Sequence, residues 1–386
     1  MSEMLPNRLG FRPFFLLAGF FAIAFMMIWL PVFVGGFAFD NYYGPIGWHS
    51  HEMIFGYTVA VIGGFLLTAV RNWTEKSTPT GNLLAGLATL WLFGRILPFF
   101  PDYFLNWFIA FIDLVFLPAL AVGIGVPLVR SGERRNLLFL PLLAALWGAN
   151  VLVHAEILGL APQLARKGMF LGLNLVVLLI VIMGGRVIPF FTERALPGVV
   201  LMRWSIIEWL SPISVVLFLL AEFLLADSLW SAGFAALAGC VNGIRLSGWY
   251  THRYWWVPLL WVLHLGYGWI AAGLFLKVGA GLGVVPPQFT IHAFTVGGIG
   301  VLTLGMMARV ALGHTGRPLR VGPAMVVAFA LVNISAVTRG LLPIFNPQWF
   351  SQLIIASGAL WIAAFLVFVI IYTPILLRPR VDGAPG

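Results

Sequence analysis

Long apolar stretches separated by short polar connectors run along the whole chain. An α-helix rises 1.5 Å per residue, so about 20 apolar residues span the hydrocarbon core of a bilayer. Backbone inside a membrane must satisfy its own hydrogen bonds, and the short alternating strands of a membrane barrel are not visible, so we predict helices. The pattern predicts twelve membrane-spanning helices, at residues 14–34, 49–70, 82–99, 104–129, 136–159, 166–190, 203–225, 229–248, 254–279, 287–310, 322–344 and 349–376.

The connectors contain turn-forming residues, as in STPTG (77–81) and in Pro197-Gly198. No polar stretch is long enough for a soluble domain, so we expect a single transmembrane domain over residues 1–386. The first apolar run is too long for a cleavable signal peptide and lacks a clean cleavage site, so we expect it to remain as the first span.

The composition supports a polytopic, all-α membrane bundle. Hydrophobic residues make up 61% of the chain and charged residues 9%, which is too little charge to keep a soluble surface wet. The single cysteine, Cys240, excludes a disulfide framework and a cysteine-rich metal site. The formal charge of +9 lies mainly in the connectors, so we explain it by membrane orientation and expect no nucleic-acid partner.

The basic residues are distributed unequally between the two ends of the predicted spans. Of the 22 Lys and Arg residues, the end opposite the chain termini holds only Arg95, Arg166, Lys167, Lys277 and Arg339. Positive charge is enriched on the cytoplasmic side of membrane proteins. We therefore predict that both termini are cytoplasmic, which agrees with an even number of spans.

This orientation gives each histidine a depth. Four of the seven fall in the outer third of the membrane, on the second, fifth and tenth spans: His49, His51, His154 and His292. His264 is expected near the middle of the ninth span, whereas His252 and His314 belong to the cytoplasmic side and receive no role.

Four histidines at one depth favour metal binding, because imidazole is a frequent ligand of iron, copper and zinc. The metal candidates are His49, His51, His154, His264 and His292, and the cofactor candidates among them are His49, His51, His264 and His292. Residues two apart on a helix point about 200° away from each other, so His49 and His51 suit two different sites. One of them could bind a haem together with His292, and the other a second metal with His154 and His264.

Two carboxylates adjoin these histidines. Glu52 and Glu156 are candidates to orient metal-bound imidazoles, and exposure at the membrane interface is the competing reading. Each histidine could equally make an ordinary hydrogen bond between helices. Asp113, Glu208 and Glu222 could pair with arginines and are assigned no role. The glycine-rich face around Gly297 suits close helix packing, or the approach of a flat macrocycle.

Several stretches resemble the NnrS family of bacterial membrane proteins, over essentially the whole chain. They are GFRPFF (10–15), WHSHEM (48–53), GFLLTAV (64–70), NWT (72–74), GGRVIPFFT (184–192), LHLGY (263–267), IHA (291–293) and GHTGRP (313–318). One difference is Ser50, where the family commonly has alanine. The resemblance implies a multi-pass protein of the bacterial inner membrane with haem, expected to be b-type, and copper.

The resemblance also implies a role in nitric oxide metabolism, denitrification or nitrosative-stress defence. It leaves open whether the protein is an oxidoreductase acting on nitric oxide, with quinol as electron donor, or a non-catalytic protein that binds nitric oxide or haem. A secondary transporter is the rival class, because twelve spans and glycine-interrupted helices suit a carrier. Membrane lipid and nitric oxide are the expected partners.

The architecture is also similar to that of the catalytic subunits of haem–copper oxidases, with twelve spans and histidines on the second and tenth. The chain departs from that group in the sixth and seventh spans, which contain no histidine here. A second metal site would therefore have to be built from other residues, and the likeness by itself implies no mechanism.

Overall fold

The computed structural model describes residues 9–36, 38–226 and 228–383. Within that part, twelve helices are long and apolar enough to cross a membrane, and they coincide with the twelve predicted spans. All regular structure in these residues is helical, so the predicted all-α membrane bundle is confirmed. The N-terminal segment before Leu9, predicted to be cytoplasmic, lies outside the described residues.

The chain divides into two compact units, which are described separately. Unit 1 comprises residues 1–172, 310–318 and 369–386, and unit 2 comprises residues 173–309 and 319–368. The first helices, in chain order, are α1 (Phe11–Phe33), α2 (Pro45–His51), the π-helix η2 (Glu52–Thr58), α3 (Val59–Thr74), α4 (Gly81–Ile96), α5 (Asn106–Ser131), α6 (Phe139–Ile157) and α7 (Ala165–Ala195). The later ones are α8 (Ser205–Leu224), α9 (Leu229–Gly248), α10 (Pro258–Gly281), α11 (Pro287–His292), the π-helix η6 (Ala293–Gly300), α12 (Val301–His314), α13 (Pro323–Gly340), α14 (Leu342–Phe345) and α15 (Phe350–Leu377).

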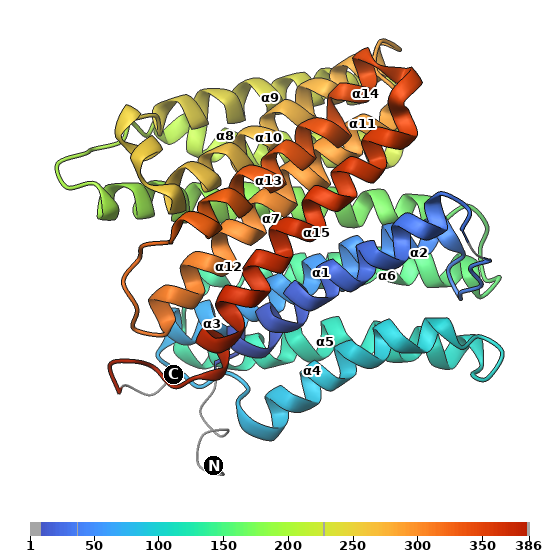
Figure 1. Cartoon of the computed structure of the whole chain (residues 1–386), viewed down its shortest axis with the longest axis horizontal. Helices are drawn as coiled ribbons and strands as arrows, with labels where there is room; N and C mark the ends of the chain where they lie inside the picture. The colour runs from blue at the N-terminus through green and yellow to red at the C-terminus, as the bar shows by residue number, and fades with distance from the viewer. Residues whose placement is uncertain (1–8, 37, 227, 384–386) are drawn as a thin grey trace. The chain divides into compact units, whose positions relative to one another are not determined.

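In unit 1, α1 packs on α3, and α5 packs on α3, α4 and α6 (Figure 1). The α1–α3 contact depends on small residues, because a Cβ atom on Gly10 would lie 2.4 Å from the Leu67 Cβ. The start of α1 is fixed by a hydrogen bond of 3.0 Å from the Phe11 amide to the Thr68 hydroxyl. These residues belong to the GFRPFF and GFLLTAV stretches, which therefore form one helix contact.

Arg12 connects the beginning of the described chain to its end. The buried guanidinium donates from Nη1 to the carbonyl oxygens of Leu376, at 3.0 Å, and Arg378, at 2.6 Å. The start of α1 and the end of α15 therefore lie at the same end of unit 1. That arrangement requires an even number of spans between them, although it leaves the cytoplasmic assignment a prediction.

In unit 2, α8, α9 and α10 lie side by side (Figure 1), and η6 packs on α10 and α13. The glycines of η6 are covered by side chains. A Cβ atom would lie 2.5 Å from the Trp269 ring at Gly297, and 2.4 Å from the Trp361 ring at Gly300. Helix packing, rather than the approach of a macrocycle, therefore accounts for these glycines.

A second glycine pair accommodates a charged network in unit 2. A Cβ atom on Gly185 would lie 2.3 Å from the Arg245 Cζ, so the guanidinium fits only against a bare backbone. Arg245 donates to Glu208 through Nε at 3.0 Å and to the Tyr267 hydroxyl through Nη1 at 3.2 Å. The GG of the GGRVIPFFT stretch thus makes room for the guanidinium of a partly buried ion pair.

Both π-helices directly follow a histidine motif. The segment η2 begins at Glu52, immediately after His51, and η6 begins at Ala293, immediately after His292. A π-helix has i→i+5 hydrogen bonds, is rare, and is found frequently at functional sites. The second and tenth spans therefore both contain a π-helix directly after their histidines.

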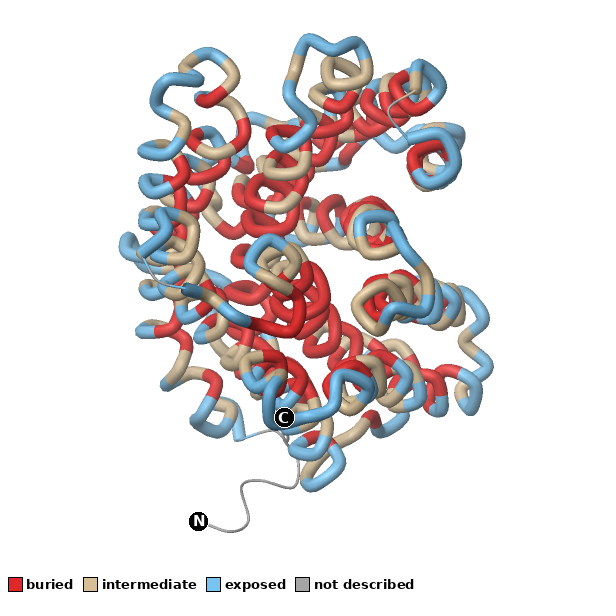
Figure 2. The backbone as a smooth tube through the Cα atoms, turned by 90° about the vertical axis from the view of Figure 1, so that its right-hand side faces the viewer, coloured by how far each residue is buried: buried red, intermediate tan, exposed pale blue. Residues whose placement is uncertain are grey.

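The outward helix faces are apolar. Figure 2 shows buried and exposed residues alternating along many of the helices, with many exposed residues in the connectors. On α8, Ile206 is 68% exposed and Trp209 is 73% exposed, and water would not be a favourable neighbour for either side chain. Lipid is the medium that suits such a face.

We expect Gly297→Ala to destabilise the protein by about 1–3 kcal/mol, because the new methyl group would overlap the rigid Trp269 indole. Thermal unfolding of the purified protein in detergent would measure the loss. Gly243→Ala on α9 is the matched control, since a Cβ atom there meets nothing within 4 Å. Equal melting temperatures for the two variants would contradict the packing described for η6.

Candidate metal centre

A cluster of buried polar side chains lies inside unit 1, where water and lipid are excluded. It is formed by the connector before α2 and by α2, η2, α4, α5 and α6, which contribute Tyr42, Tyr43, His51, Glu52, Arg95, Asp113, Asn150 and His154. Ionisable groups at membrane depth are costly and usually mark a functional position. We therefore take this cluster as the candidate site.

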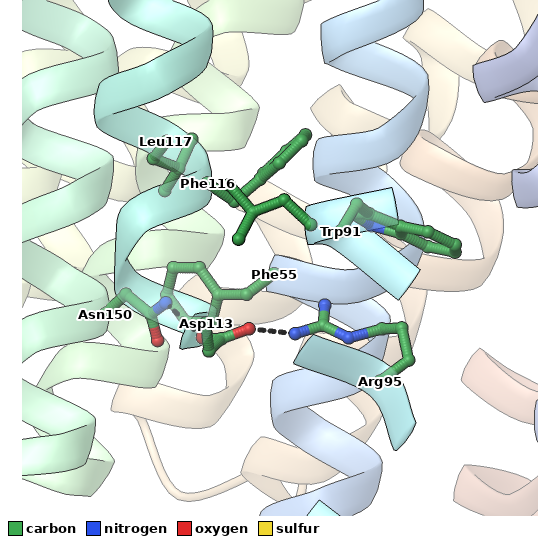
Figure 3. Close-up of a pocket in the computed structure, with 8 residues that line it drawn as sticks. Phe55, Trp91, Arg95, Asp113, Phe116, Leu117 and Asn150 are labelled. Atoms are coloured by element: carbon green, nitrogen blue, oxygen red, sulfur yellow. Dashed lines mark hydrogen bonds and ion pairs between the residues drawn. The ribbon is translucent and has the colours of Figure 1, made fainter. Parts of the chain in front are cut away.

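Arg95 carries the only positive charge of the cluster that does not depend on the protonation of a histidine. Its Nε atom lies 3.0 Å from the Glu52 Oε2, and its Nη2 atom pairs with the Asp113 Oδ1. Figure 3 shows Arg95 and Asp113 facing each other beside Trp91, which lines the same small pocket. The ionised carboxylates of Glu52 and Asp113 face one guanidinium. One further positive charge would therefore neutralise the cluster.

Two imidazoles meet at the second oxygen of Asp113. The Nε2 atom of His51 lies 3.2 Å from the Asp113 Oδ2, and that of His154 lies 3.1 Å from the same oxygen. These three residues can each offer one donor atom, all within 4.8 Å of one another. Asn150 also contacts this centre, donating from Nδ2 to the Asp113 Oδ2 at 2.7 Å.

The other nitrogen of each ring has an oxygen partner. The Nδ1 of His51 lies 3.1 Å from the Glu52 Oε1, and its Nε2 lies 2.9 Å from the Asn150 Oδ1 and beside the Asp113 Oδ2. These oxygens only accept, so both nitrogens of this ring carry a proton. The Nε2 of His154 donates to the Asp113 Oδ2 at 3.1 Å, and its Nδ1 lies 3.0 Å from the Tyr42 hydroxyl, which can donate to it. A metal ion at this point would replace the proton on each Nε2, while the oxygens at Nδ1 would orient the two rings, as outer oxygens do in metal sites.

Tyr43 covers the centre from the connector before α2. Its ring stacks on His51 at a centroid distance of 4.1 Å, and its hydroxyl lies 3.2 Å from the His51 Nε2. Burial raises the pKa of Tyr43 well above its ordinary value, and it also raises the pKa of Tyr42. Both phenols therefore remain protonated at neutral pH.

The donor set suits a transition-metal ion. Ligands bonded at about 2.0–2.1 Å to one tetrahedral ion lie about 3.3 Å apart, close to the separations between Asp113 and the two imidazoles. Two imidazoles with a carboxylate suit zinc, copper or iron. An ion of charge +1 would balance the second carboxylate. His51, His154 and Asp113 therefore fit a metal ion, with Glu52 and Tyr42 orienting the rings.

His49 points to a different environment. It lies within α2 and not before the helix, and its ring stacks on Trp29 at 4.2 Å and on Phe25 at 5.3 Å. His49 and His51 thus have separate surroundings, as their spacing of two residues predicts. The structure brings His51, but not His49, into one group with His154.

The two remaining candidates lie in unit 2. The Nδ1 of His264 lies 2.9 Å from the Leu260 carbonyl oxygen, and that of His292 lies 2.7 Å from the Gln288 carbonyl oxygen. A carbonyl only accepts, so each ring carries its proton on Nδ1 and its lone pair on Nε2. His264 is not at mid-span, because α10 begins at Pro258, and the ring stacks on Tyr254 at 4.1 Å, before the helix.

The two predicted orienting carboxylates differ in their contacts. Glu52 is fully buried and holds His51, which excludes its exposure at the membrane interface. Glu156 instead accepts a hydrogen bond of 2.6 Å from the Ala165 amide, so its carboxylate holds the start of α7.

A profile of the NnrS protein family matches residues 7–380. The chain belongs to the NnrS family. A comparison with curated proteins finds no match. The NnrS stretches noted in the sequence include the WHSHEM residues that supply His51 and Glu52 to the centre.

Sequence reasoning missed Arg95, Asn150, Tyr42 and Tyr43 as members of this centre, and left Asp113 without a role. The signal for two of them was present, because Arg95 and Asp113 are opposite charges within neighbouring spans, and such charges must find partners. Glu208 pairs with Arg245, as expected, whereas Glu222 pairs with Lys277 and not with an arginine.

We expect Asp113→Asn to destabilise the protein by about 3–5 kcal/mol, because it leaves Arg95 buried with only one of its two carboxylates. Denaturant unfolding in detergent micelles would measure the loss. The control is Glu193→Gln, which breaks an ion pair with Arg203 that is 45% exposed on the arginine side and should cost less than about 1 kcal/mol. A loss for Asp113→Asn as small as that of the control would contradict the pairing.

Proposed function

We propose that this NnrS protein binds copper and haem in the membrane and acts on nitric oxide, with quinol as electron donor. The observation that carries the proposal is the buried donor group of His51, His154 and Asp113, which fits a copper ion. The part that concerns nitric oxide rests on family resemblance. Bound haem and copper would supply redox-active centres at which the gas binds and electrons are exchanged.

The protein residues prepare the centre in three ways. Glu52 and Tyr42 hold the two imidazoles by Nδ1, so both Nε2 atoms are directed at one point beside Asp113. Arg95 holds the other oxygen of Asp113 and compensates part of the carboxylate charge. Tyr43 stacks on His51 and excludes water from that ring.

The histidines proposed to bind copper differ from those proposed to bind haem iron. Of the candidate histidines, those left for haem iron are His49, His264 and His292, and the last two carry their proton on Nδ1. A metal-bound imidazole commonly donates its other ring proton to a carbonyl or carboxylate, and both rings do so. The preferred haem ligand is His292, because the π-helix η6 begins directly below it, as η2 does below His51.

We expect His51→Ala and His154→Ala to lose copper while retaining haem, because each removes one of three donors to a single ion. Elemental analysis of copper and iron, with reduced-minus-oxidised spectra, would measure both cofactors in the purified protein. Glu156→Gln is the control, since Glu156 contacts the start of α7, and it should retain both. Full copper content in both alanine variants would refute this ligand set, and absence of copper, iron and a Soret band from the wild type would refute the metalloprotein itself.

We expect the purified protein to consume nitric oxide when supplied with reduced quinol. Reduction of two nitric oxide molecules to nitrous oxide and water takes two electrons and two protons, which oxidation of one quinol to quinone supplies. A nitric oxide electrode with detection of nitrous oxide would measure turnover. A spectral change on binding the gas without its consumption would show a non-catalytic binding protein, and substrate flux into liposomes without metal would show a carrier.

A further inference from the structure

Arg339 differs from the other membrane-embedded cations described above. Its side chain lies in the last turn of α13, with the guanidinium 5.7 Å from the centre of the Phe350 ring. The Nη1 atom is buried and has no hydrogen-bond partner among residues 9–36, 38–226 and 228–383. By contrast, Arg95, Arg245 and Lys277 each contact a carboxylate.

The Arg339 side chain is partly exposed, and a guanidinium with a buried nitrogen and no anion still carries a desolvation cost. The aromatic ring of Phe350 offsets only part of that cost, since cation–π contacts are worth about 0.5–2 kcal/mol. Five N–H donors in a planar fork match the two oxygens of a carboxylate or the oxygens of a phosphate. The chemistry of Arg339 therefore indicates an oxyanion that comes from outside the protein chain.

The surroundings of Arg339 indicate which ligand brings the oxyanion. Gly340 packs on the backbone beside His292, where a Cβ atom would lie 3.4 Å from the Ala293 amide nitrogen and 3.7 Å from the Phe289 carbonyl oxygen. Phe289 also contacts Phe350, with ring centres 6.2 Å apart. The end of α13 and the turn that ends in His292 therefore form one end of unit 2, which contains an imidazole and an unpaired guanidinium.

We propose that Arg339 binds a carboxylate group of the haem whose iron is bound by His292. The inference rests on the proposed function, since it requires that haem is present. Haem combines an iron that accepts an imidazole with carboxylates that suit a guanidinium, so one ligand can contact both groups. The alternative source of the same oxyanion chemistry is the phosphate of a lipid headgroup.

The test measures haem retention and not activity. Wild type and Arg339→Met are purified in detergent, and transfer of haem to excess apomyoglobin is followed by absorbance. A charge-assisted hydrogen bond lost from the complex should speed release about tenfold or more. Arg339→Lys, which restores the charge but not the planar fork, should fall between the two.

A second arm identifies the group on the haem. Haem-depleted protein is reconstituted with haem or with its dimethyl ester, which has the same iron and ring but no free carboxylate. Wild type should release the ester faster than haem, and Arg339→Met should release both equally fast. Arg166→Met is the matched control, because Arg166 also lies over an aromatic ring, that of Phe170, at 5.5 Å.

The outcomes separate this inference from the proposed function. If wild type binds haem and Arg339→Met releases it at the same rate, Arg339 does not bind the haem carboxylate. The proposal that the protein binds haem would still stand. Absence of haem from wild type overturns both. A third outcome combines two results: Arg339→Met releases haem at the wild-type rate, and it loses the thermal stabilisation that phosphatidylglycerol gives the wild type. That outcome would refute binding of a haem carboxylate by Arg339 and would identify a lipid phosphate as its ligand.

Discussion

The requirement that a charge inside a bilayer be paired organises unit 1. Arg95 lies between Glu52 and Asp113, which come from η2 and α5, so three spans are held together by one guanidinium. Because Asp113 gives one oxygen to Arg95, only its other oxygen faces the imidazoles. The position of the histidine pair is therefore determined by an ion pair that contains no histidine.

The same hydrogen-bond arrangement recurs at four histidines with different partners. His51 uses a carboxylate, His154 a phenol, and His264 and His292 the carbonyl four residues earlier in the same helix. In each case an oxygen lies at Nδ1 and fixes the direction in which Nε2 points. A helical carbonyl is always available at this spacing, whereas Glu52 and Tyr42 have to be brought by the fold.

Hydropathy was sufficient to predict the helices, because crossing a membrane demands a long apolar helix and leaves few alternatives. The spacing of His49 and His51 also predicted their separate surroundings. The members of the centre were harder to predict, because the sequence does not say which faces of α4, α5 and α6 meet. Arg95 was read as a charge at the end of a span, and Tyr42 and Tyr43 lie in a connector where hydropathy gives no signal.

The two π-helices have a consequence for how these spans can change. A π-helical turn holds about one residue more than an α-helical turn, so the helix beyond it is rotated about its axis. In the second span, the end with His51 is therefore in a different angular register from the end with Gly64, which packs on α1. One end can face a cofactor while the other faces a neighbouring helix. Loss of a single residue within η2 would remove this offset and turn the end with His51 relative to the end with Gly64.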